Sequence, residues 1–166
     1  AGQHLEGMLQ RGFTTVRDAG GADSGHRTAV EKGLFLGPRL FVSGKILSQT
    51  GGHGDHRAIA DVCGCESVAG GMSVIADGVD AVRLAVRENV RQGVDQIKIM
   101  GGGGVASPGD KLIHPQYSLD EIEAIVDEAN RCGRYVMAHI YSDLGIRRAV
   151  EKGVRSVEHG NFLTID

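Results

Sequence analysis

The sequence predicts an α/β fold in which helices alternate with the strands of a parallel sheet. A helical segment with one apolar face, a glycine and a short strand follow one another in that order four times along the chain. The pentapeptide Ala-Val-Glu-Lys-Gly occurs at both 29–33 and 149–153, which indicates a repeated structural unit. Alternating strands and helices form right-handed βαβ units, which build either an open doubly wound sheet or a (β/α) barrel.

The expected elements follow in order from this pattern. Strands are expected at 14–18, 39–43, 96–100, 135–140 and 155–159, and helices at 2–11, 24–35, 78–92, 118–132 and 144–152. Four of these helices run into a glycine, the residue that most easily closes a helix in the left-handed conformation. Asp77 is a candidate N-cap for the third helix. Ser118 and Glu121 have the spacing of a capping box at the start of the fourth.

Composition excludes several classes of protein. The 166 residues fit one domain or a piece of a larger one, and 41% hydrophobic with 23% charged residues is typical of a globular chain. A net charge of −3, no tryptophan and few other aromatic residues argue against a nucleic-acid partner. No apolar run reaches the ~20 residues of a membrane helix, and Ala1–Gln10 lacks the apolar stretch of a signal peptide.

The three cysteines, Cys63, Cys65 and Cys132, are expected to be free thiols. An odd number fits a reducing compartment, which favours a cytoplasmic location, better than a disulfide framework. A single residue separates Cys63 from Cys65, which is closer than the pairs that hold a structural zinc ion.

Polar side chains occupy the carboxyl ends of three successive expected strands, where both candidate architectures place their chemistry. The residues on either side of Lys98 in its expected strand are apolar, which indicates that the strand is buried. A buried ammonium group is unfavourable unless it is paired or chemically changed, so Lys98 is an unusual residue at this position. His139 and Tyr141 share one face of the next strand, and His159 ends the one after it. Imidazole is the commonest protein ligand of zinc-type ions, so the three ends together indicate a metal site.

These residues resemble the amidohydrolase superfamily of metal-dependent hydrolases. The segments 11–21, 37–44, 49–55 and 157–160 are similar to its imidazolonepropionase-related branch, and most similar to its prolidases and arginine-type carboxypeptidases. The resemblance extends over essentially the whole chain. It implies a partial (β/α)8 TIM barrel, with residues 1–166 forming about strands two to six of a single catalytic barrel domain whose N- and C-terminal parts are missing.

The resemblance also implies a site and a reaction. Lys98, carboxylated by CO2, would bridge two divalent metal ions, expected to be Zn2+, and His139 and His159 would bind one of them. A metal-activated hydroxide would hydrolyse an amide or peptide bond of a small substrate such as a dipeptide. Tyr141 is a candidate hydrogen-bond donor or substrate contact, and His53 lies in a segment similar to the family's substrate-binding loop.

Two elements of the family pattern are missing. None of the seven histidines forms the His-x-His pair that supplies the other metal, and the catalytic aspartate of the last barrel strand would lie beyond Asp166. The chain alone is therefore expected to be inactive. In the isolated chain, the outer strands 14–18 and 155–159 would have unpaired edges, which favour self-association. Separately, the full-length protein is expected to be a homo-oligomer.

Three other functions remain open. A cyclic-amide hydrolase of the imidazolonepropionase type shares the reaction class. The segment Gly104–Lys111 comes close to a phosphate-binding loop, although Asp110 stands where the motif requires lysine. Finally, the lysine and histidines could be structural residues of a non-catalytic βα scaffold.

Overall fold

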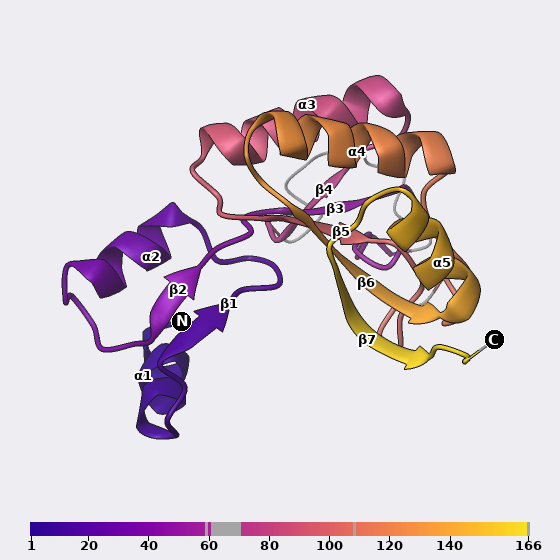
Figure 1. Ribbon diagram of the computed structural model, residues 1–166. Coiled ribbons are helices and arrows are strands. Elements are labelled where there is room, and N and C mark those ends of the chain that lie inside the picture. The colour runs from indigo at the N-terminus through magenta and orange to yellow at the C-terminus, as the bar shows by residue number, and fades with distance from the viewer. Residues whose placement is uncertain (59, 61–70, 108, 166) are drawn as a thin grey trace.

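The computed structural model describes residues 1–58, 60, 71–107 and 109–165 (Figure 1). In chain order the elements are α1 (Gly2–Gln10), β1 (Thr15–Arg17), α2 (Ser24–Glu31), β2 (Arg39–Phe41), β3 (Ile46–Ser48), β4 (Ser73–Ile75), α3 (Val79–Arg91), β5 (Ile97–Met100), α4 (Leu119–Arg131), β6 (Val136–Ser142), α5 (Asp143–Glu151) and β7 (Ser156–Phe162). No helix in these ranges is long and apolar enough to cross a lipid bilayer.

The five expected strands and five expected helices are all present, with ends that differ by a few residues. The largest difference is in α2, which ends at Glu31 rather than near residue 35. The glycine after each helix has a positive φ, from 66° at Gly133 to 91° at Gly12. The capping box of α4 is confirmed, because the Glu121 amide donates to Ser118 Oγ and the Ser118 amide donates back to the Glu121 carboxylate.

The expectation that Asp77 caps α3 was wrong. The N-cap is Gly78, whose amide donates to Glu121 Oε1 of the neighbouring helix α4 at 2.7 Å. Asp77 instead accepts hydrogen bonds from the backbone amide and the hydroxyl of Thr50. A carboxylate next to a helix can satisfy a loop instead of the helix end, and sequence spacing does not distinguish the two.

Two strands, β3 and β4, were not expected from the sequence. Only Val42–Lys45 separates β3 from β2, and Gly44 in this link has a φ of 65°. The chain therefore bends at Gly44, so that β2 pairs with β1 while β3 pairs with β4 and β5. A methyl group on Gly44 would lie 2.8 Å from Val94, which shows how closely the bend packs.

All strand pairs are parallel, as expected, and they form two sheets with the orders β1-β2 and β4-β3-β5-β6-β7. The Asp95 amide joins the sheets by donating to the Val42 carbonyl at 2.8 Å, next to the start of β5. The strands form part of a barrel wall that does not close. Of the two predicted edges, β1 pairs with β2 alone and β7 with β6 alone among the described strands.

The main core lies between the five-stranded sheet and its covering helices, and Figure 1 shows α3 and α4 side by side over the sheet. Its fully buried members include Val82, Val86, Ile97, Ile99, Ile125 and Ile140. A smaller core joins α1 to β2 through Leu5, Leu40 and Val42. This packing fixes the strands whose carboxyl ends hold the predicted site residues.

Candidate active site at the carboxyl ends of the strands

Lys98 lies in β5, where all four residues are buried, and its side chain is only 3% exposed. Within the described ranges it makes no hydrogen bond or salt bridge. Burial lowers the pKa of its ammonium group to about 8, while the carboxylate of Glu158 acts in the opposite direction and Arg17 adds to the lowering. The prediction that the sheet buries this lysine is confirmed.

His139 is the most buried of the three predicted histidines. It lies in β6, is 4% exposed, and its Nε2 is 3.0 Å from the carbonyl oxygen of Gly103. A carbonyl oxygen only accepts hydrogen bonds, so Nε2 carries the proton and Nδ1 keeps its lone pair. Burial lowers the pKa of the ring to about 4, which favours the neutral form.

Three further predicted side chains gather around His139. The His53 ring stacks on it with a centroid distance of 4.3 Å, and His159 meets it edge-on at 4.7 Å. Tyr141 packs against His139 at 4.9 Å and stacks on His159 at 5.0 Å. His53 comes from the loop after β3, so segments far apart in the sequence form one cluster.

Lys98 belongs to the same group. Lys98 and Met100 point to the same face of β5, and Met100 is paired with His139 of β6, so Lys98 and His139 lie on one face of adjacent strands. Burial lowers the pKa of both His53 and His139, and the charge of Lys98 acts in the same direction. The structure therefore brings together all five predicted residues, Lys98, His53, His139, Tyr141 and His159. Their proximity agrees with a shared site, and their individual roles are taken up below as proposals.

His159 has a strained backbone. Its φ is 79°, a region that non-glycine residues rarely occupy, and it is exposed although it is still paired with Ile140 of β6. The β6–β7 register shifts between Ile140 and Ser142, next to the partner of His159. Such strain is maintained only where the surrounding structure enforces it, and it is frequent at functional sites.

The glycine-rich loop after β5 is packed against these side chains. A methyl group on Gly104 would lie 1.9 Å from Cε1 of His53, and one on Gly103 would lie 2.1 Å from the Lys111 carbonyl oxygen. The glycines thus permit close contact between backbone and ring. A phosphate-binding loop would open directly into a helix, whereas here the next helix, α4, begins only at Leu119.

An ion pair that the sequence did not predict lies near the same residues. Arg17 of β1 donates to Glu158 of β7 at 3.1 Å, and Ser156 donates to the same carboxylate oxygen at 2.6 Å. β1 and β7 belong to different sheets, so this contact links the two ends of the open wall. Arg17 and Glu158 lie in the segments 11–21 and 157–160 that resemble the amidohydrolase superfamily, but their separation in sequence gives no indication of the contact.

The side chains at the strand ends supply part of the donor set that a metal ion requires. In the described part of the chain, no group of three or more His, Cys, Asp or Glu side chains is arranged to hold one. His139 and His159 nevertheless lie within reach of a common ion, and the Nε2 bond of His139 to a carbonyl is the outer contact usual for metal-binding histidines. With Lys98 beside them, the residues fit part of a metal centre.

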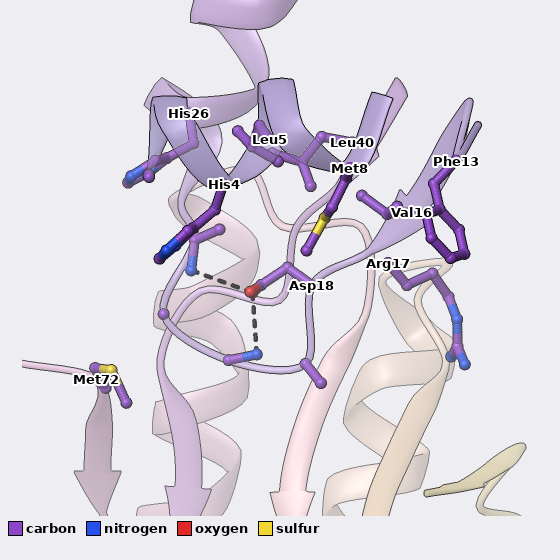
Figure 2. A pocket seen from close by; sticks show the side chains of 15 residues that line it. His4, Leu5, Met8, Phe13, Val16, Arg17, Asp18, His26, Leu40 and Met72 are labelled. Carbon is purple, nitrogen blue, oxygen red and sulfur yellow. Dashed lines mark hydrogen bonds between the residues drawn. The ribbon is translucent and has the colours of Figure 1, made fainter. Parts of the chain in front are cut away.

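A large hollow lies away from this cluster. It has a volume of about 690 Å3 and runs along β1, where α1 and β2 contribute apolar side chains such as Leu5, Met8 and Leu40 (Figure 2). Asp18 stabilises its rim by accepting from the amides of Gly20 and Ala22. The hollow contains none of the five predicted site residues, so its size is no guide to the chemistry.

Two of the cysteines predicted to be free, Cys63 and Cys65, lie outside the described residues, while Cys132 is a free thiol.

Sequence reasoning missed several residues that support the cluster, namely Phe162 beside Tyr141, and Ser107, Asp110 and Gln116 beside His53. Only the position of Asp110 and Ser107 in the glycine-rich segment could have drawn attention to them.

Comparison with known proteins gives consistent results. Ochratoxinase from Aspergillus niger is 40% identical over 164 residues, covering 93% of this chain and 34% of that protein. A crystallised prolidase complexed with N-methylphosphonate-L-proline is 56% identical, with a TM-score of 0.93 over 98% of this chain and 41% of its own. A Xaa-Pro dipeptidase with bound methionine in the active site is 36% identical, with a TM-score of 0.86.

The chain thus spans between about a third and two fifths of the proteins it resembles. The model of the amidohydrolase family matches residues 2–164, nearly the entire chain. This match agrees with the parallel sheet, with the partial barrel, and with the residues gathered at the carboxyl ends of the strands. The chain belongs to the amidohydrolase family.

Proposed function

We propose that the protein containing this chain hydrolyses an amide bond in a small substrate, specifically a dipeptide of the Xaa-Pro type. The observation that carries this proposal is the convergence of Lys98, His139 and His159 from three consecutive strands of the wall. The 56% identity to a prolidase supports the choice of substrate. The similarity to ochratoxinase is lower and supports the reaction class less specifically.

The proposed cofactor is a pair of divalent metal ions, with zinc as the first candidate. Lys98, carboxylated on Nζ, would bridge them, and His139 through Nδ1 and His159 would bind one of the two. An amine buried without a hydrogen-bond partner among the described residues is a suitable group for this modification. Such ions, when bound, lower the pKa of a water molecule and polarise a carbonyl oxygen.

The chain's own residues would bind and orient the substrate. Tyr141 is half-buried beside both metal-binding candidates, so its hydroxyl can donate to the substrate carbonyl oxygen. His53, which stacks on His139, would contact the substrate. Phe162, with its ring 6.2 Å from that of Tyr141, extends the apolar side of the site.

Replacing Lys98 tests the metal centre. In the complete protein, Lys98→Ala should reduce the bound metal to background. It should also lower kcat/KM for an Xaa-Pro dipeptide by at least 100-fold. Lys32→Ala, which removes an exposed lysine at the end of α2, is the matched control and should retain both. Two metal ions per chain in active Lys98→Ala protein would exclude a bridging role for this lysine.

A substrate panel tests the second part of the proposal. Hydrolysis of Xaa-Pro dipeptides should exceed hydrolysis of cyclic amides, such as an imidazolone ring, by the same metal-loaded preparation. The reverse order would assign the protein to cyclic-amide hydrolysis, with the reaction class unchanged. Absence of metal-dependent hydrolysis of either class would leave the non-catalytic scaffold as the better interpretation.

A further inference from the structure

The hydrogen bonds around His53 form a closed ring that begins and ends on this residue. Its backbone amide donates to Gln116 Oε1 at 3.0 Å, and Gln116 Nε2 donates to Asp110 Oδ2 at 2.7 Å. Ser107 donates its hydroxyl proton to Asp110 Oδ1, and its Oγ lies 2.9 Å from Nδ1 of His53. Four residues from two loops are thus connected through both the backbone and the ring of His53.

The chemistry of this ring allows one assignment of its protons. The Asp110 carboxylate only accepts, so it receives the amide hydrogen of Gln116 and the hydroxyl hydrogen of Ser107. Ser107 has then used its single hydrogen, and its oxygen must accept from His53. Nδ1 of His53 therefore carries a proton, and Nε2 is the ring nitrogen left without a partner within the described ranges.

Packing also restrains the same ring. One face of His53 stacks on His139 at 4.3 Å, and Gly104 lies so close that a methyl group there would be 2.1 Å from Nδ1. Gln116 is only 3% exposed, which shields its two hydrogen bonds from water. Its neighbour Tyr117, at a φ of 58°, donates its amide to Gln49 Oε1 at 2.5 Å, which ties the two loops together a second time.

We infer that Ser107, Asp110 and Gln116 are positioning residues, which hold His53 as its Nδ1–H tautomer and leave Nε2 free to meet the substrate. The contribution to substrate binding rests on the proposed function. The tautomer does not depend on it, because it follows from hydrogen bonds within the chain. An imidazole without such partners in water favours the opposite tautomer, so the effect of the cluster is measurable.

The direct test is 15N NMR of the complete protein labelled at histidine, recorded at pH 8. We expect the His53 signals of a protonated Nδ1 and an unprotonated Nε2. Ser107→Ala should shift the ring toward the Nε2–H form, and Ser107→Thr, which keeps a hydroxyl, should restore the original signals. Ser73→Ala is the matched control, because Ser73 is buried near the same loop and its Oγ has no partner among the described residues.

Kinetics provide the second readout. Ser107→Ala should raise KM for an Xaa-Pro dipeptide about tenfold with kcat and metal content nearly unchanged, and Ser107→Thr should reverse most of the increase. An Nε2–H tautomer in the unmodified protein, or identical signals and KM in Ser107→Ala, would overturn the inference. If no variant hydrolyses a dipeptide while the tautomer shifts as described, the proposed function fails and the positioning cluster stands.

Discussion

Replacing Gly104 with alanine should displace the His53 ring. The added methyl carbon would lie 1.9 Å from Cε1 and 2.3 Å from Nε2 of this ring. Non-bonded carbons pack at about 3.5–4.0 Å, so the ring or the loop has to move by about 1.5–2 Å. A movement of that size breaks the 2.9 Å contact between Nδ1 and Ser107 Oγ and disturbs the stack on His139.

A misplacement of about 1 Å in a substrate-positioning group can reduce the rate about 100-fold. We therefore expect Gly104→Ala to lower kcat/KM for an Xaa-Pro dipeptide at least 100-fold, which corresponds to about 2.7 kcal/mol of transition-state stabilisation. Bound metal should remain, because the atoms nearest to the added methyl group belong to His53, which is not one of the proposed metal ligands. Steady-state kinetics with metal analysis on the same protein preparation provide the measurement.

Gly109 provides a control within the same loop. Among the described residues, a methyl group at this position meets no atom within 4 Å apart from its chain neighbours, so Gly109→Ala should leave kcat/KM within about twofold of the original value. If Gly104→Ala is as active as Gly109→Ala, the His53 ring is not needed in its present position. That result would refute the reasoning from close packing to substrate binding.

Three further predictions concern stability and are read from chemical denaturation. Glu128→Gln should destabilise the fold by about 1.5 kcal/mol, because this 7% exposed carboxylate accepts from Arg87 at 2.8 and 3.0 Å and from Arg83 at 3.1 Å between α3 and α4. The pKa of Glu128 is lowered, chiefly by its hydrogen bonds to Arg87, so the carboxylate stabilises the fold while it is ionised. The difference in unfolding free energy between the original protein and Glu128→Gln should therefore be complete above pH 4.5 and shrink as the pH falls below that value. A difference that grows in acid would contradict this explanation. Gly133→Ala should cost about 1 kcal/mol although no atom obstructs the methyl group, because φ is 66°, and an unchanged midpoint would disprove the backbone explanation.

The sequence allowed correct prediction of the elements that carry their own local signals. Five of the seven strands were identified by one recurring pattern. In that pattern a helix with one apolar stripe is followed by a closing glycine and then by an apolar strand. β3 and β4 were missed because neither follows an expected helix and its closing glycine, and three residues alone are too few for a periodic pattern. They are strands only because β3 lies between β4 and β5, and that pairing depends on the bend at Gly44.

The candidate site divides in the same way. Lys98, His139 and His159 could be predicted as neighbours because parallel strands bring their carboxyl ends to one edge of the sheet. The environment of His53 could not be predicted, because its partners Ser107 and Gln116 lie 54 and 63 residues further along the chain. Loop-to-loop hydrogen bonds at that separation are set by the folded geometry and leave no pattern in the sequence.

The glycine-rich loop after β5 determines how the imidazoles of His53 and His139 are held. Its Gly103 carbonyl fixes the proton of His139 on Nε2, while Ser107 at its far end fixes the proton of His53 on Nδ1. The two stacked rings therefore present different nitrogens, Nδ1 in one and Nε2 in the other. A flexible loop could not maintain this difference, so the glycines serve close packing, and substitutions that fit the loop sterically should leave both tautomers intact.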